Sequence, residues 1–312
     1  MQSANPPERH HYIPAFYLKR WTSPHDNKLT QYSRPRGPNG PVVDARRAAK
    51  ATGFEPGLYS LDDHPPAKAQ VLEERFFKPI DGAAAKSLEM MEAAGNEAQW
   101  DSDRRTAWTR FLLSLLLRCP EDVKAFRGFW PDFFSETDAA SEVRYRAARQ
   151  PGDPETFAEF IQSQPLSYME ASRAGVWMNL IDNSRVGEKI NNMHWRVIKL
   201  DHCVPSLLTS DRPMIMQVPL NEPGGHIALP IGPNTLFLAS HDVDLMNRVL
   251  SVPPLTIAKG ANVQVVEGAA SYVYGTDASQ LRFVQNRMGR NQAARTLQKI
   301  FEKRRNTTNP LP

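Results

Sequence analysis

The sequence predicts an α+β fold, in which a largely helical middle is followed by a small, mostly antiparallel or mixed sheet and closed by C-terminal helices. Apolar residues recur at helical spacing through residues 67–193, and from His194 onward the pattern changes to strand-like alternation. No expected strand leads into a glycine-rich phosphate loop, so neither nucleotide-binding fingerprint applies. Helices segregated before strands therefore favour α+β over a doubly wound α/β sheet.

The 312 residues divide into three regions that we expect to form one integrated globular unit. Residues 1–66 form an extended N-terminal arm, residues 67–193 are helical, and residues 194–312 are strand-rich with a terminal helix. Within the arm, residues 28–33 alternate like a strand and are closed by a loop rich in proline and glycine.

The helical region contains one segment that is apolar nearly all round, Trp108–Leu117, which predicts a buried central helix. Asp101 or Ser102 is its expected N-cap, and Arg118 ends it. Pro79 is expected to kink or split the preceding helical run. The helices expected in this region cover residues 67–94, 102–118, 121–134, a segment opened by Asp153-Pro154-Glu155, and 167–193.

The remaining elements follow from alternation and from bounding Pro, Gly or Asn residues. Strands are expected over residues 195–200, 214–218, 235–239 and 271–274, and helices over residues 241–250, 261–271 and 279–305.

The formal net charge of +4 is distributed unevenly, with an acidic body between two basic ends. Residues 1–50 carry +6 and residues 281–312 carry +7, which leaves −9 on the body. A pI near 9.0 therefore does not describe a uniformly basic protein.

We expect a cytoplasmic protein that does not enter a membrane. The longest apolar run, residues 111–117, is far shorter than the roughly 20 residues of a membrane span. Residues 1–7 lack the pattern of a secretory signal. Cys119 and Cys203 are too few for a disulfide framework, which favours a reducing compartment.

The first candidate site is the segment that begins with His10 and His11. Neutral imidazole suits a general base or a metal ligand, but adjacent residues of a strand face opposite ways, so we expect only one of the two in a given pocket. The alternative is that the aromatic residues of this segment attach the arm to the body and the histidines are its polar ends.

The second candidate is Asp211, which with Ser210 lies between two expected strands and is followed by Arg212-Pro213. Asp211 could orient a histidine, bind a metal or act as a base. The same residues also suit a turn whose side chains bind local amides, and the sequence leaves both interpretations open.

The third candidate is a set of charged groups on two helices. Glu74 and Asp81 are about two helical turns apart, so they share one face roughly 11 Å apart along the axis, with Glu73 beside them. They could line one groove or form a solvated face. Arg118 ends the most apolar helix and is expected to need an acidic partner, for which Asp211 or Glu74 are candidates.

Several motifs together carry a family resemblance across residues 10–275. They are His10-His11-Tyr12-Ile13-Pro14-x-Phe16-Tyr17-Leu18, an acidic helix at 71–81, Arg118-x-Pro120, Thr209-Ser210-Asp211-x-Pro213, Pro230-x-x-Pro233, Asn262 and Ala270–Tyr274. In this order they resemble the uncharacterised bacterial family called domain of unknown function 4238. The resemblance implies no activity, but it favours a shared polar pocket that includes His10 or His11 and Asp211.

We expect an enzyme whose catalytic residues are His10, His11, Asp211 and Glu74 and whose substrate contacts are Arg118, Ser210 and Asn262. The reaction that best uses these groups is hydrolysis of a phosphodiester or nucleic-acid substrate, for which a divalent metal ion would be the cofactor. A phosphorylated small molecule is the other expected partner.

The alternative is a non-catalytic module that binds nucleic acid or protein. The cations of the expected C-terminal helix could follow a phosphate backbone, or they could be the solvated face of a packed helix whose apolar side carries Leu297, Ile300 and Phe301. A toxin or defence component that acts with a partner protein is a third hypothesis.

Overall fold

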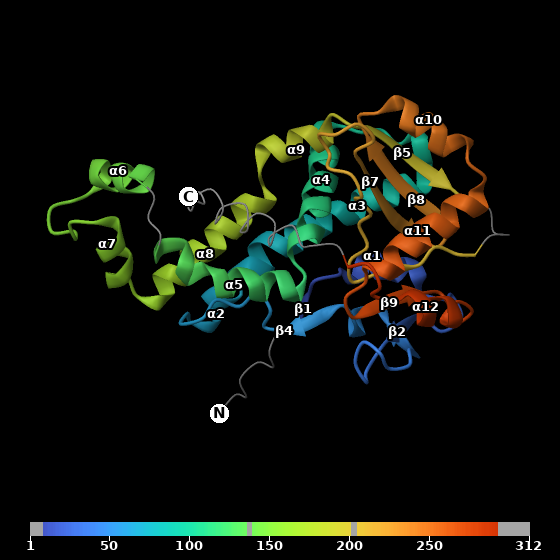
Figure 1. The fold of residues 1–312 in the computed structure, drawn as a ribbon, viewed down its shortest axis with the longest axis horizontal. Coiled ribbons are helices and arrows are strands. Elements are labelled where there is room, and N and C mark those ends of the chain that lie inside the picture. The colour runs from blue at the N-terminus through green and yellow to red at the C-terminus, as the bar shows by residue number, and fades with distance from the viewer. Residues whose placement is uncertain (1–8, 136–138, 201–204, 293–312) are drawn as a thin grey trace, which may run out of the picture.

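The computed structural model describes residues 9–135, 139–200 and 205–292 (Figure 1). Helices dominate the middle of the chain, and every described strand pair is antiparallel. The predicted α+β class is therefore confirmed, with three small sheets in place of one.

The central helix α4 (Ser102–Leu117) forms where the sequence predicts it. The Asp101 side chain caps it by accepting a hydrogen bond from the Arg104 backbone N–H at 2.7 Å. Trp108 and Phe111 are fully buried, and Trp108 packs edge-on against Phe237 of the three-stranded sheet. This helix therefore joins the helical part to the sheet.

The expected helix over residues 67–94 is divided. It consists of α2 (Pro66–Ala69), a π-helical turn η3 (Glu73–Phe77) and α3 (Lys78–Ala94). Pro79 lies in the first turn of α3 and has no backbone N–H, so it interrupts the regular helical hydrogen bonding at this point. The wider π turn η3 comes directly before α3. This π turn changes which glutamate faces the interior.

The other helices of the middle are α5 (Pro120–Ser135), α6 (Ala139–Ala148), α7 (Phe157–Ser163), α8 (Leu166–Ile181) and α9 (Ser184–Asn191). The start expected at Asp153-Pro154 was wrong, because α7 begins after Thr156, which forms a capping box with Glu159. In Figure 1, α6 and α7 project from one end of the molecule, away from the sheets.

Strands from both ends of the chain share one sheet. Its order is β3 (Val43–Ala48), β2 (Lys28–Ser33), β9 (Tyr272–Gly275) and β6 (Thr209–Ser210). The edge strand β3 was not predicted from the sequence, because its Val-Asp-Ala-Arg-Arg-Ala stretch lacks apolar alternation. A two-stranded sheet pairs β1 (Arg9–His11) with β4 (Phe54–Pro56).

The third sheet has the order β5 (His194–Lys199), β8 (Thr235–Ser240) and β7 (His226–Gly232). The strand expected over residues 214–218 was wrong, because only Ile215 makes a bridge there, to Ala228. Strand β7 was missed because it contains Pro230. Proline is tolerated there because β7 is an edge strand with an irregular register at that residue.

The C-terminal helices are α10 (Val243–Ser251), α11 (Pro254–Gly268) and α12 (Leu281–Arg287). The continuous helix expected over residues 279–305 was wrong in its described part, because α12 ends at Arg287 and Gly289 has a φ of +74°. Residues 293–305 of that expectation lie outside the described ranges.

The aromatic residues of the N-terminal arm attach it to the strand-rich region. The short helix α1 (Ala15–Leu18) carries Tyr17, whose hydroxyl donates to the Pro230 carbonyl at 2.5 Å and bonds Thr209 Oγ1 at 2.7 Å. Trp21 donates from Nε1 to the Leu207 carbonyl at 2.7 Å. These buried contacts fix the position of β1, which carries the two candidate histidines.

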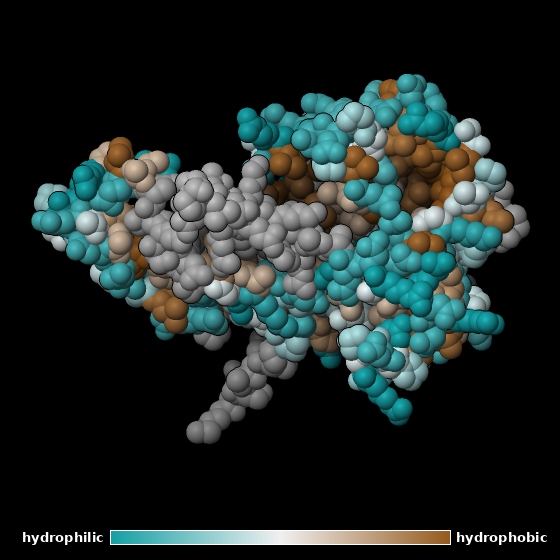
Figure 2. Space-filling view, in the orientation of Figure 1, coloured by the Kyte–Doolittle hydropathy of each residue, from teal (hydrophilic) through white to brown (hydrophobic). Residues whose placement is uncertain are grey.

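The surface in Figure 2 is largely hydrophilic, and hydrophobic residues gather in a hollow beside α10. Within the described ranges, the helices are all too short or too polar to traverse a lipid bilayer.

Candidate functional site

His10 and His11 point in opposite directions from β1. His10 is fully buried and stacks on the Tyr59 ring at 5.4 Å. Its Nδ1 accepts from the Tyr59 backbone N–H at 2.8 Å, and its Nε2 lies 2.5 Å from Gln70 Oε1. Since Nδ1 is an acceptor, the network assigns the proton to Nε2. Both ring nitrogens of His10 are therefore engaged in holding the arm.

His11 is half-buried, and its Nε2 is buried without a hydrogen-bond partner among the described residues. Burial lowers the pKa of His11, and the positive charges of Arg118 and Arg9 lower it further, against a hydrogen bond with the Lys50 backbone. The imidazole is therefore neutral near pH 7 and has a nitrogen available for proton transfer.

The glutamate that faces the interior is Glu73. Glu74 is exposed and forms an ion pair with Lys78 one turn along the helix. Glu73 is only 7% exposed, and its Oε2 is buried without a described hydrogen-bond partner. A π turn takes one residue more than an α turn, so it gives Glu73 the inward position that regular spacing assigns to Glu74.

Burial raises the pKa of Glu73 to about 7, and the nearby Asp81 carboxylate contributes to the rise. The charges of Lys78 and Arg118 oppose it. Glu73 therefore exchanges its proton near neutral pH, as a catalytic acid or base does.

Arg118 follows α4 and is fully buried. Its Nη1 donates to Asp81 Oδ1 at 2.9 Å, so its acidic partner is neither Asp211 nor Glu74, the two expected from the sequence. Its Nε and Nη2 have no described partner, and its carbonyl accepts from the Tyr59 hydroxyl at 2.8 Å. A buried guanidinium with two unsatisfied donor groups is costly, which makes it a candidate anion site.

Phenylalanine rings enclose this guanidinium. The Arg118 Cζ lies 5.6 Å from the centre of the Phe111 ring and 5.8 Å from that of Phe77. Burial raises the pKa of Asp81, and the charge of Arg118 and its hydrogen bond act in the opposite direction. The low-dielectric surroundings strengthen any charge interaction made here.

We call Arg118, Asp81, Glu73 and His11 the Arg118 cluster. Arg118 contacts Asp81 directly, and its charge also acts on the pKa of His11 and of Glu73, which come from β1 and η3. The sequence singled out Arg118, His11, Asp81 and both glutamates. It chose Glu74 as the catalytic one, and a catalytic role for Glu74 stays a prediction.

Asp211 lies in a loop at the end of β6, and its backbone carbonyl accepts from the thiol of Cys119, the residue after Arg118, at 3.3 Å. Its two carboxylate oxygens accept from the backbone N–H groups of Ala270, Ser271 and Tyr272 at 2.9, 2.5 and 2.9 Å. Burial raises its pKa to about 6, against these three hydrogen bonds. The carboxylate is thus occupied in fixing the start of β9, and a catalytic role for Asp211 stays a prediction.

Ser210 and Asn262 also bond to the backbone. Ser210 Oγ accepts from the Arg212 N–H at 3.1 Å. Asn262 Oδ1 accepts from the Leu208 N–H at 2.8 Å, and its Nδ2 donates to the Ser206 carbonyl at 2.9 Å. The Asn262 contacts hold the segment before β6 and the Ser210 contact holds the turn after it. Substrate binding by either residue stays a prediction.

A divalent metal ion was an expected cofactor, and such an ion needs several His, Cys, Asp or Glu side chains close together. In the part of the chain that the structure describes, no three His, Cys, Asp or Glu residues are grouped closely enough to hold a metal. Asp81, the carboxylate nearest the guanidinium, is engaged by Arg118. The described residues therefore do not fit the expected metal site.

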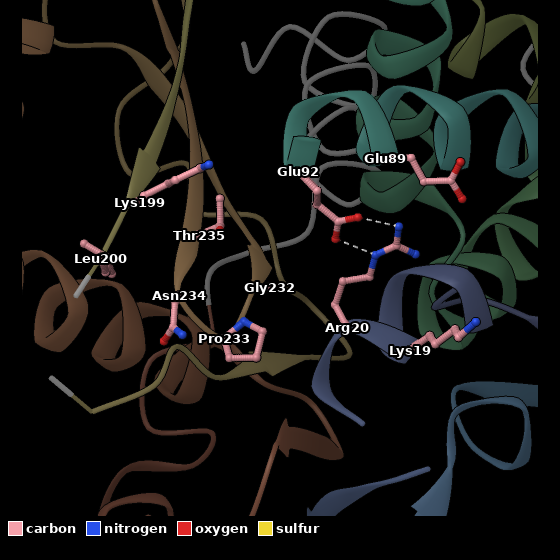
Figure 3. Close-up of a pocket in the computed structure, with 10 residues that line it drawn as sticks. All are labelled: Lys19, Arg20, Glu89, Glu92, Lys199, Leu200, Gly232, Pro233, Asn234 and Thr235. Atoms are coloured by element: carbon pink, nitrogen blue, oxygen red, sulfur yellow. Dashed lines mark hydrogen bonds and ion pairs between the residues drawn. The ribbon is translucent and has the colours of Figure 1, made fainter. Parts of the chain in front are cut away.

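A separate cavity of about 680 Å³ lies between α3 and the turn that joins β7 to β8 (Figure 3). Arg20 donates to both carboxylate oxygens of Glu92 at 2.7 and 2.8 Å, and to the Phe16 carbonyl at 2.7 Å. This guanidinium is fully partnered, and the residues that line the cavity include no site residue predicted from the sequence. The cavity is therefore separate from the Arg118 site, and its other lining cations are Lys19 and Lys199.

The cations of the C-terminal segment are described only in part. Arg287 forms an ion pair with Glu267 at 2.7 Å, and Arg282 and Arg290 are exposed. The remaining cations and the apolar residues of the expected helix lie outside the described ranges: Arg295, Lys299, Lys303, Arg304, Arg305, Leu297, Ile300 and Phe301. Nucleic-acid binding by this segment stays a prediction.

Comparison with known proteins gives a family but no activity. No curated protein and no solved structure matches the chain. One family model matches residues 9–279, which contain all four residues of the Arg118 cluster. The chain therefore belongs to the family described as protein of unknown function (DUF4238).

Proposed function

We propose that the protein is a hydrolase that binds the phosphate of a phosphodiester at Arg118 and cleaves it by acid–base catalysis with His11 and Glu73. One observation carries the proposal: a fully buried guanidinium has two unpartnered donor groups, and its charge acts on the Glu73 carboxyl, whose pKa is raised to about 7.

The donor geometry of Arg118 supports an anionic ligand. Nε and Nη2 lie on one edge of the planar guanidinium, and this edge matches two phosphate oxygens in a bidentate arrangement. Asp81 engages the remaining nitrogen, Nη1, and so fixes the orientation of the guanidinium. A phosphate on the free edge would satisfy both donors.

The two titrating groups have complementary protonation states. The pKa of His11 is lowered, so it is unprotonated near neutral pH and accepts a proton. The pKa of Glu73 is raised to about 7, so a large fraction of it is protonated and can donate a proton. One base and one acid are the pair that hydrolysis of an ester requires.

In the proposed step, a water oxygen forms a bond to phosphorus while His11 takes a proton from that water. The bond from phosphorus to the leaving oxygen breaks, and Glu73 donates its proton to that oxygen. The products are an alcohol and a phosphomonoester. His11 then releases its proton to solvent and Glu73 regains one, which restores the starting state. Arg118 stabilises the negative charge on the phosphoryl oxygens throughout.

The test is hydrolysis of a dinucleoside monophosphate by the purified chain, followed as nucleoside release, because the alkoxide leaving group of this ester needs the proton of Glu73. Glu73→Gln removes the acid and keeps the shape, so we expect kcat to fall about 100-fold or more. The matched control is Glu89→Gln on the exposed face of α3, which should stay within about twofold of the unchanged protein.

Glu74→Gln distinguishes the two glutamates. If it abolishes activity and Glu73→Gln does not, the glutamate indicated by regular helical spacing is the catalytic one and the present assignment is wrong. Binding of the ester without turnover in the unchanged protein would overturn hydrolysis and favour the non-catalytic binding module instead.

A further inference from the structure

A polar groove is lined in part by Ala270, Ser271 and Tyr272, whose N–H groups bind Asp211, and the Arg118 cluster does not explain it. It has a volume of about 830 Å³, within the range typical of small-molecule sites. Its walls come from the loop between β2 and β3, the start of β9, and the segment that follows α12. Figure 2 shows that the surface over β2, β9 and α12 is predominantly hydrophilic. We call it the Arg34 groove.

The charged side chains that line the groove are all positive. Arg34 and Arg290 are the charged residues among its described lining residues, and no carboxylate lines it. The other lining side chains are rich in amides and hydroxyls, including Asn39, Ser271 and Asn286. This composition suits an anion that also carries several hydrogen-bonding groups.

Arg34 holds the two walls in position. Its Nη1 donates to the Gly40 carbonyl in the β2–β3 loop, and its Nη2 donates to the Gln285 carbonyl of α12 at 2.7 Å. Gln285 Oε1 in turn accepts from the Val42 N–H at 2.5 Å. The groove is thus cross-linked by side-chain to backbone contacts, which makes it a preformed site rather than a gap between loops.

Tyr272 supplies an aromatic wall. It is half-buried, its N–H is fixed by Asp211 at 2.9 Å, and its ring lies nearly parallel to that of Tyr274 at 6.3 Å. A rigidly held, partly exposed aromatic ring is the surface on which a nucleobase stacks, with about 1–3 kcal/mol per base.

We propose that the Arg34 groove binds a nucleoside monophosphate. Arg290 contacts the phosphate, the amide and hydroxyl side chains contact the ribose and the edge of the base, and the base stacks on Tyr272. Arg34 acts as a positioning residue, and its charge adds to the attraction for the phosphate. The proposal does not depend on hydrolysis at the Arg118 cluster, because it concerns binding to different residues.

The test is calorimetric titration of the full chain at low ionic strength with the four common ribonucleoside monophosphates. Ribose 5-phosphate, a nucleoside and inorganic phosphate are the comparison ligands. We expect at least one monophosphate to bind about tenfold or more tightly than ribose 5-phosphate and than phosphate, because these two lack the base. If none does, the nucleotide proposal is wrong, and equal binding of all phosphates would indicate a simple anion site.

Two substitutions locate the binding site. Arg290→Gln should weaken monophosphate binding about tenfold and leave nucleoside binding unchanged, whereas Arg282→Gln, the same change at an exposed position outside the groove, should have no effect. Tyr272→Leu should remove the preference for a base over ribose 5-phosphate. Equal loss in Arg290→Gln and Arg282→Gln would overturn the assignment to this groove. The far-ultraviolet circular dichroism of each variant reports whether it is folded.

Discussion

Arg118 and Asp81 form an ion pair in which the guanidinium is fully buried and the carboxylate side chain keeps 21% of its surface exposed. The partly exposed Asp81 carboxylate therefore compensates the charge of the buried guanidinium. Tyr59, stacked on His10 and hydrogen-bonded to the Arg118 carbonyl, links this pair to β1.

Removal of one partner from this pair should be costly. Asp81→Asn leaves Arg118 charged, buried and without a counter-charge, so we expect the free energy of unfolding to fall by about 3 kcal/mol. The matched control is Asp182→Asn, which breaks the exposed pair with Arg110 and should cost at most about 1 kcal/mol. Urea denaturation of both variants gives the comparison. Equal losses would mean that Arg118 does not depend on Asp81.

Glu73 should make stability depend on pH. Its pKa rises from 4.5 in the unfolded chain to about 7 in the fold. The folded state thus binds the Glu73 proton more tightly than the unfolded chain does. The contribution of this proton to the free energy of unfolding is therefore complete below pH 4.5 and is lost as pH rises toward 7. At 1.36 kcal/mol per pKa unit, the loss is about 3 kcal/mol.

The variant Glu73→Gln separates the effect of Glu73 on stability from the effects of two other groups. The lowered pKa of His11 makes the free energy of unfolding increase with pH, and the raised pKa of Asp211 makes it decrease with pH. We expect Glu73→Gln to be more stable than the unchanged protein at pH 8 and close to it at pH 4.5, as measured by urea denaturation. Glu89→Gln should show no such difference. A constant offset across this pH range would contradict the raised pKa of Glu73.

The sequence predicted elements that rest on local patterns. The apolar Trp108–Leu117 segment could only be a buried helix, and Asp101 was a recognisable cap, so α4 was found with its cap. Strand β2 followed from alternation over residues 28–33. In each case, a single segment contained all of the necessary signal.

Features that depend on a neighbouring element were missed. Strand β7 contains Pro230 and exists because it pairs along β8 at the edge of the sheet. Glu73 faces inward because of a π turn, which regular 3.6-residue spacing does not reveal. Pro79 was the one local signal that this helical run departs from regular 3.6-residue spacing. The sequence indicated that Arg118 needs an acidic partner, but it did not identify Asp81, because the ion pair joins two separate helices.

Asp211 provides a test of a structural role against a catalytic one. Its carboxylate accepts three backbone N–H groups, and Asn has only one accepting oxygen, so Asp211→Asn should lower the free energy of unfolding by about 3 kcal/mol. The control Asp277→Asn, at an exposed carboxylate that accepts from the Ser279 N–H, should cost about 1 kcal/mol. Folded Asp211→Asn protein should retain phosphodiesterase activity, and a 100-fold loss would instead support the catalytic role.

The activity of the Arg118 cluster should fall at acid pH and again above about pH 7. At acid pH His11 gains a proton and no longer accepts one from water, and burial lowers the pKa of His11, so this fall lies below the usual histidine range. Above about pH 7 Glu73 loses the proton that the leaving oxygen needs, because its pKa is about 7. The measurement is kcat/KM for a dinucleoside monophosphate from pH 4.5 to 9 at constant ionic strength. We expect the fall on the acid side to disappear in the residual activity of His11→Gln. Activity that keeps increasing above pH 8 would show that protonated Glu73 is not the acid.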